Sequence, residues 1–195
     1  MPVSELPRRY VITPPGLEGP ALLAGLEEVL ARGARLIQLR LVPLEPAEHA
    51  ALAAEALRLC RARGARLLIN GPQELAAAWG MDGVHLSARR LASLEARPAL
   101  GLAGASCHGP EELARAAALG LDYALLSPVR PTASHPERPA LGWERFAAWA
   151  REVAGTLPVY ALGGVGPEDL GRAREAGAWG VAGIRAFWEG DDPLA

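Results

Sequence analysis

The chain has 195 residues, 50% of them hydrophobic and 22% charged, and 20 Lys+Arg against 22 Asp+Glu give a formal net charge of -2. This composition suffices for a full core and excludes wholesale disorder, and the charge balance argues against nucleic-acid or anionic-membrane partners. Because two cysteines cannot form a disulfide framework, no apolar run reaches the ~18 residues of a membrane helix and the N-terminal residues lack a signal-peptide pattern, we expect a cytoplasmic protein with free thiols.

Short apolar runs rich in Val, Ile and Leu alternate with Ala-, Leu-, Glu- and Arg-rich stretches of helical periodicity. Strands and helices alternate in the first half over residues 9–13, 20–32, 35–40, 46–63, 66–70, 73–79, 83–86 and 89–96. In the second half they are expected over residues 100–106, 111–119, 122–127, 143–154, 158–162, 167–176 and 179–184, before a short terminal helix. Several of the helices end at a glycine, which is typical of helix C-termini.

This order gives eight strand–helix units without a linker or a break in composition. Apolar strands joined by single helices indicate parallel pairing with right-handed crossovers. A doubly wound open sheet is one arrangement of such units. Eight units and the lack of an early G-x-G-x-x-G motif favour a closed (β/α)8 TIM barrel, formed as one compact domain over residues 1–195.

Polar residues are expected at the C-terminal ends of the strands, where the chemistry of such barrels is located. They are Thr13, Gln38, Arg40, Asn70, His85, Ser87, Ser106, Cys107, His108 and Ser127. His85 is as readily a core histidine with satisfied hydrogen bonds as a site residue. His49, in an alanine-rich helix, is expected to be solvent-exposed.

Glycine follows both of the last two strands, at Gly163 and Gly164 and again at Gly183, which Arg185 follows closely. In barrels the loops after these strands often bind phosphate through backbone N–H groups, and glycine lets an anion approach the backbone. The sequence therefore predicts a phosphate site here. It predicts no metal cluster, because His85 and His108 lack carboxylates at the neighbouring strand ends.

The connection over residues 127–142 is much longer than the others and contains four prolines. Thr132, Ser134 and His135 lie in it. Long connections in compact domains are usually functional, and prolines lower the entropy cost of ordering them. We interpret it as a lid over the barrel mouth, and the alternative is a solvated proline-rich loop.

Seven short motifs, taken together and in order, resemble the thiamine phosphate synthase superfamily, which also contains thiazole tautomerases. They are Tyr10-Val-Ile-Thr13, Ile37-Gln-Leu-Arg40, Leu68-Ile-Asn70, Asp82-Gly-Val-His-Leu86, Ala105-Ser-Cys-His108, Ser127-Pro-Val-Arg-Pro-Thr132 and Ala161-Leu-Gly-Gly164. The resemblance runs over residues 10–187. It is closest to the synthase-like domain that is fused to Nudix hydrolases, which leaves open a functional link to a Nudix hydrolase.

The synthases of this family join a hydroxymethylpyrimidine diphosphate to a thiazole phosphate, with Mg²⁺ and a cationic residue stabilising the departing pyrophosphate. The resemblance implies that Gln38 and Arg40 contact the pyrimidine and its diphosphate. The other matching residues are Asn70 and Ser106 on the pyrimidine side, Ser127 at the strand end, Thr132 and Ser134 in the substrate loop, and Gly163, Gly164 and Ile184 around the thiazole phosphate.

Several positions depart from the family pattern. Gly71 stands where one metal carboxylate is expected, and the second position falls within residues 87–90, which contain none. Val42 and His135 stand where the synthases have lysines, and Pro128 stands where the tautomerases have their acid/base histidine. Two lost carboxylates do not suit Mg²⁺, so we expect no metal and no other cofactor.

These features lead to a metal-independent proton transfer on a phosphorylated thiazole or thiamine precursor, with His108 as the acid/base group and His135 second. One alternative is a thiamine phosphate synthase with an altered site, in which Arg40, Arg89 or Arg130 replaces the metal. Others are a non-catalytic thiamine-phosphate-binding protein and a different phosphate-binding barrel isomerase. The expected partner is a small phosphorylated heterocycle, without nucleic acid or membrane, and a homodimer stays open.

Overall fold

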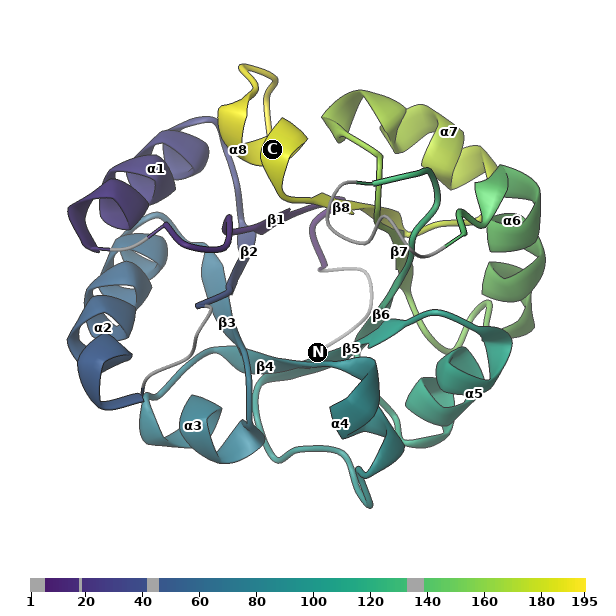
Figure 1. The fold of residues 1–195 in the computed structure, drawn as a ribbon, viewed down its shortest axis with the longest axis horizontal. Coiled ribbons are helices and arrows are strands. Elements are labelled where there is room, and N and C mark those ends of the chain that lie inside the picture. The colour runs from purple at the N-terminus through teal and green to yellow at the C-terminus, as the bar shows by residue number, and fades with distance from the viewer. Residues whose placement is uncertain (1–5, 18, 42–45, 133–138) are drawn as a thin grey trace.

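A computed structural model describes residues 6–17, 19–41, 46–132 and 139–195. Eight parallel strands pair in chain order, and the first strand pairs with the last, so the sheet closes into a barrel. Figure 1 looks down this barrel and shows the helices arranged around its outside. The predicted (β/α)8 barrel is therefore confirmed, and the open sheet is excluded.

The strands are β1 (Arg9–Ile12), β2 (Leu36–Leu39), β3 (Arg66–Asn70), β4 (Gly83–Leu86), β5 (Leu102–Cys107), β6 (Tyr123–Leu126), β7 (Val159–Ala161) and β8 (Gly180–Gly183). The helices are α1 (Gly19–Ala31), α2 (Pro46–Ala62), α3 (Gln73–Ala78), α4 (Ala88–Ala92), α5 (Pro110–Ala118), α6 (Gly142–Glu152), the 3₁₀ turn η2 (Pro167–Asp169), α7 (Leu170–Glu175) and α8 (Arg185–Glu189). In the described part of the chain no helix is long and apolar enough to cross a membrane.

Most elements begin and end within two residues of the expected positions, but α4 is shorter. It ends at Ala92, whereas helical periodicity continues to residue 96. In the segment that follows, the Arg97 guanidinium donates to the carbonyl oxygens of Pro98 and Leu100 and pairs with Asp122 at 2.7 Å. These bonds hold the chain in a loop between α4 and β5.

His49 was expected to be exposed, and this prediction is wrong, because its side chain is 8% exposed. Three other residues of α2, Ala53, Ala56 and Cys60, are also buried, and with His49 they follow the spacing of one helix face. That face packs toward the barrel and α1. Alanine-rich composition hid the apolar stripe to which residue 49 belongs.

Side chains alternate along each strand between the helices and the barrel interior. The interior cluster includes Tyr10, Tyr123 and Tyr160, whose rings meet edge to face with centroids 5.4–5.9 Å apart. The Tyr123 ring occupies the space beside Gly104 of β5, where an added Cβ would lie 2.1 Å from its Cζ. A glycine is therefore required at that position for the three rings to fit.

Candidate active site

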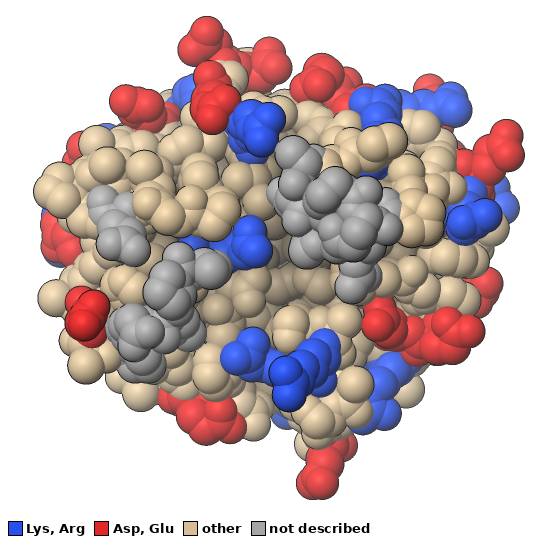
Figure 2. Space-filling view, in the orientation of Figure 1, with Lys and Arg blue, Asp and Glu red and all other residues tan. Residues whose placement is uncertain are grey.

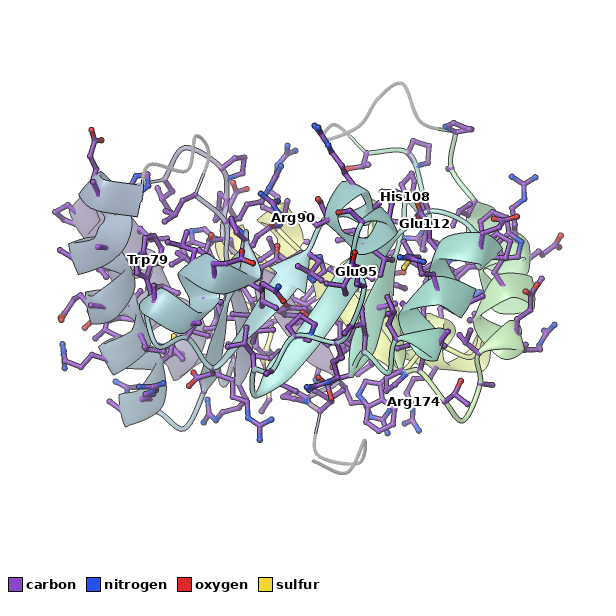
Figure 3. The ribbon with its side chains drawn as sticks, turned by 90° about the horizontal axis from the view of Figure 1, so that it is seen from below. Trp79, Arg90, Glu95, His108, Glu112 and Arg174 are labelled. Carbon is purple, nitrogen blue, oxygen red and sulfur yellow. The ribbon has the colours of Figure 1, made fainter. Side chains whose placement is uncertain are left out.

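The C-terminal ends of the strands form one end of the barrel, which faces the viewer in Figure 1. Figure 3 turns the molecule and shows His108 and Glu112 at this end, with Arg90 on the same side and Arg174 at the opposite end. The predicted polar residues at strand ends are thus brought to one face. We call this face the barrel mouth.

Two amide side chains meet where β2 and β3 reach the mouth. Asn70 Nδ2 donates to Gln38 Oε1 at 2.8 Å, and Gln38 Nε2 donates to the Tyr10 hydroxyl at 3.3 Å. Gln38 is 1% exposed and Asn70 is half-buried. The amide groups are therefore held in a fixed orientation, with Asn70 the one closer to solvent.

His85 lies inside the barrel and also contacts a predicted site residue. Its Nδ1 is 3.0 Å from the Tyr123 hydroxyl, and its Nε2 is 2.9 Å from Ser106 Oγ. Burial lowers the pKa of His85 to about 3, because no counter-charge compensates the loss of water around an imidazolium. The structure therefore shows a core histidine with satisfied hydrogen bonds, whose ring also contacts the Ser106 hydroxyl.

His108 follows β5 and is half-buried at the mouth. Its Nδ1 is 2.9 Å from the Ser127 carbonyl oxygen, which can only accept, so Nδ1 carries the proton. In the neutral ring Nε2 is then the unprotonated nitrogen. The His108 backbone N–H donates to Glu112 at 2.5 Å and fixes the residue further. The His108 ring is thus held in one orientation by the Ser127 carbonyl.

The loop after β6 is anchored at both ends. Val129 N–H donates to the Leu162 carbonyl and Arg130 N–H to that of Gly163, each at 2.9 Å. On the return path, Gly142 N–H donates to the Val129 carbonyl at 2.9 Å. Thr132 is half-buried. Ser134 and His135, on which the lid prediction depends, lie outside the described residues.

Gly163 and Gly164 adopt positive φ values of 92° and 67° beneath this loop. A Cβ on Gly164 would lie 2.6 Å from the Arg130 Cβ and 2.8 Å from the Pro131 carbonyl oxygen. Arg130 also binds Asp169 with both terminal nitrogens, at 2.9 and 2.8 Å. The glycine pair thus permits close contact between the loops after β6 and β7.

The predicted phosphate residues of β8 lie beside these loops in the barrel order. Gly183 is buried, and a Cβ there would meet the Phe187 ring at 2.4 Å, which gives this glycine a packing role as well. Ile184 and Arg185 stand at the start of α8, where the first backbone N–H groups of a helix lack partners within it. Arg185 is exposed. The arrangement is compatible with an anion at the mouth.

Figure 2 shows Lys/Arg atoms gathered around the centre of this face, with Asp/Glu atoms mostly toward its edge. Besides Arg130 and Arg185, three further arginines belong to the elements that meet here. Arg40 follows β2, half-buried, with its backbone N–H donating to Thr13 Oγ1 at 2.8 Å, and Arg89 and Arg90 of α4 are exposed. The mouth therefore presents positive charge to a ligand.

The two positions at which a family metal site needs carboxylates do not suit Mg²⁺. Gly71 is buried, and at residues 87–90 the Ser87 hydroxyl accepts from the Arg90 N–H at 3.3 Å. Among the described residues, no three His, Cys, Asp or Glu side chains are grouped to hold a metal ion. Guanidinium groups repel a cation, so this donor set does not fit the metal.

Sequence reasoning missed Tyr10, Tyr123 and Asp169, which connect the predicted residues to one another. Tyr10 and Tyr123 hydroxyls are 2.8 Å apart although the residues are 113 positions apart in the chain. The period of two within β1 and β6 could have assigned both rings to the interior. No local pattern could have paired them.

The family model for thiamine monophosphate synthase matches residues 9–187. A thiamine-phosphate synthase of Thermus thermophilus is 39% identical over 185 residues, which cover 94% of this chain and 89% of the relative. A putative thiamine-phosphate synthase 2 of Aquifex aeolicus is 37% identical, with 95% and 100% covered. A solved thiamine phosphate pyrophosphorylase of Pyrococcus furiosus superposes with a TM-score of 0.77 at 26% identity, covering 96% of this chain and 90% of that one.

Proposed function

Because the chain belongs to the thiamine monophosphate synthase family, we propose that it forms thiamine monophosphate from a pyrimidine diphosphate and a thiazole phosphate. Arginines, rather than a metal ion, face the departing pyrophosphate. In this reaction the thiazole nitrogen forms a bond to the pyrimidine methylene carbon while the carbon–oxygen bond to the diphosphate breaks. The observation that carries the proposal is a cationic mouth next to a fixed amide pair, in a chain aligned over most of its length with synthases.

The amide pair supports recognition of the pyrimidine. Gln38 is held by Tyr10 and Asn70, so neither of its polar atoms is free to turn. Asn70 is half-buried and keeps its Oδ1 for a ligand donor such as an exocyclic amine. A buried, oriented amide discriminates strongly against a ligand that lacks the matching group, since its polar atoms would lose their partners.

The arginines support departure of the pyrophosphate. Arg40 follows β2, and Arg89 and Arg90 follow β4, on either side of β3 at the same end of the barrel. Guanidinium groups bind phosphate oxygens in a bidentate manner. Positive charge placed where negative charge develops stabilises the transition state, and such placement usually contributes the largest share of catalysis. The thiazole phosphate is assigned to Gly163, Gly164 and the start of α8.

The test incubates the pure protein with hydroxymethylpyrimidine diphosphate and thiazole phosphate and measures thiamine monophosphate and pyrophosphate. The expected result is equal amounts of both products. Arg40→Met should lower the rate much more than Arg58→Met, a control at an exposed pair with Glu55 on the outer helix α2. Absence of both products from the wild-type protein would overturn the proposal.

His108 favours a second function, a tautomerase-like proton transfer on the thiazole phosphate. Its Nδ1 is held by the Ser127 carbonyl, so Nε2 is the basic nitrogen. Incubation with thiazole phosphate in D₂O separates the two functions, because only proton transfer exchanges hydrogen for deuterium. Binding of thiamine monophosphate without either reaction would identify a binding protein.

A further inference from the structure

Six inward-facing side chains, one from each of β1–β6, form a continuous hydrogen-bond chain through the barrel interior. In bonding order they are Asn70, Gln38, Tyr10, Tyr123, His85 and Ser106, with successive polar atoms 2.8, 3.3, 2.8, 3.0 and 2.9 Å apart. The four central residues are at most 1% exposed, and the two end residues are half-buried at the mouth. We call this set the interior chain.

The direction of the first bonds follows from the Gln38 amide. Its carbonyl oxygen accepts from Asn70, and its nitrogen donates to the Tyr10 hydroxyl. A phenol has one proton, so Tyr10 gives its proton to Tyr123, its remaining partner. The opposite direction would leave the Tyr10 proton without an acceptor at a fully buried position, which is costly.

The same assignment of protons to donors continues through the His85 imidazole. Tyr123, having accepted from Tyr10, donates to His85 Nδ1. Burial keeps His85 neutral by lowering its pKa to about 3, and a neutral imidazole has a single N–H. That proton is then on Nε2, which donates to Ser106 Oγ.

We propose that the interior chain has one polarity, from Asn70 to Ser106, and that Tyr10, Tyr123 and His85 are positioning residues that make Ser106 a hydrogen-bond donor to the ligand. Because Ser106 already accepts from His85, its own proton is free to point toward the mouth. The matching ligand atom is an acceptor, such as an unprotonated ring nitrogen. A heterocycle presenting N–H there would leave the Ser106 proton without this acceptor and would bind less tightly.

The inference rests on the proposed function only for the identity of the ligand. Its first test is made on the ligand-free protein. In protein labelled with ¹⁵N-histidine, nitrogen–proton correlation spectra distinguish a protonated ring nitrogen from an unprotonated one. His85→Gln assigns the signals. We expect the proton on Nε2 of His85 in the ligand-free protein. A proton on Nδ1, or exchange between the two tautomers, would overturn the proposal.

The second test compares Tyr123→Phe with Tyr160→Phe. Both rings belong to the same cluster, but the Tyr160 hydroxyl donates to the Pro7 carbonyl, outside the interior chain. Both variants should lose stability. Only Tyr123→Phe removes the donor at His85 Nδ1, so it alone should disturb the tautomer and weaken binding of thiamine monophosphate, by about three- to tenfold.

Equal losses of affinity in the two variants would assign the effect to packing and overturn the positioning role. If the wild-type protein does not bind thiamine monophosphate, the proposed function is contradicted, and the histidine spectra still decide the polarity. The two failures are therefore distinguishable.

Discussion

Arg130 donates to both carboxylate oxygens of Asp169, at 2.9 and 2.8 Å, across 39 positions of the sequence. Asp169 also accepts from the Gly166 N–H at 3.0 Å and is 9% exposed. One carboxylate thus joins the loop after β6 to the turn after β7. The loops that would enclose a phosphate are held by a charged pair rather than by apolar packing alone.

Asp169→Asn should lower the free energy of unfolding by about 1–2 kcal/mol, because the partly buried bonds to a guanidinium lose their charge and Arg130 is itself solvent-exposed. Urea denaturation measures this change. The control is Glu55→Gln, at the exposed pair with Arg58 on α2, which should leave the midpoint almost unchanged. An unaffected midpoint in Asp169→Asn would show that the pair does not stabilise the loops.

Gly164→Ala should weaken binding of phosphorylated ligands, because the new Cβ displaces the Arg130 loop. Gly177→Ala is the matched control, since Gly177 also has a positive φ, of 85°, but has open space around its Cβ position. Alanine is strained at both positions, because both require a positive φ. Only Gly164→Ala also displaces a loop at the barrel mouth. Affinities for inorganic phosphate and thiamine monophosphate check this. Similar affinities in the two variants would remove Gly164 from the phosphate site.

EDTA should leave the synthase rate within about twofold of the untreated rate, since Gly71 and residues 87–90 offer no carboxylate for Mg²⁺. Arg89→Met and Arg90→Met, made together, should instead lower the rate by about tenfold or more. Initial rates of pyrophosphate release measure both effects. Loss of activity in EDTA that Mg²⁺ restores would contradict the arginine mechanism.

Acid should destabilise the fold through His85. In the unfolded chain His85 binds a proton with a pKa near 6.5, whereas in the folded protein its pKa is about 3. The contribution of neutral His85 to stability is therefore fully present above pH 6.5 and is lost as the pH falls toward 3. The slope is at most about 1.4 kcal/mol per pH unit. Measuring the free energy of unfolding between pH 6.5 and 5 separates the effect of His85 from that of most carboxylates, which titrate at lower pH. In His85→Gln this part of the slope should vanish, and an unchanged slope would mean that His85 is charged in the folded state.

His108→Ala should reduce turnover more than His135→Ala, because His108 is fixed by the Ser127 carbonyl and by Glu112. His135→Ala should lower ligand affinity or turnover and leave the melting temperature nearly unchanged. The measurements are the proton-exchange rate with thiazole phosphate, the affinity for that ligand and the melting temperature of each variant. Parent-like behaviour of both would remove the proton-transfer function and favour a binding protein.

The barrel was predictable because the local sequence pattern marks each strand–helix unit. β3, from Arg66 to Asn70, and β4, from Gly83 to Leu86, occupy the expected residues because both are apolar runs next to a glycine-terminated helix. The position of a residue at a strand end then follows from the fold class. This reasoning brought Gln38, Asn70, Ser106 and His108 to one end of the barrel.

The connections among these residues were not predictable. Tyr10 and Tyr123 meet only because β1 and β6 face each other across a closed barrel, and the closure depends on β8 pairing with β1. The pairing of Arg130 with Asp169 depends likewise on two neighbouring loops. Such contacts are set by tertiary geometry, which local periodicity does not encode.

The fit of the Tyr123 ring against Gly104 couples the substitutions that β5 and β6 can accept during evolution. A lineage that gains any side chain at residue 104 has to lose the ring at residue 123, because the added Cβ would lie 2.1 Å from Cζ. Losing that ring also removes the hydroxyl next to His85. Under the proposed polarity of the interior chain, substitutions in the middle of the barrel alter ligand preference at its mouth while every residue there stays the same, so homologues are best grouped by residues 104 and 123 before their substrates are compared.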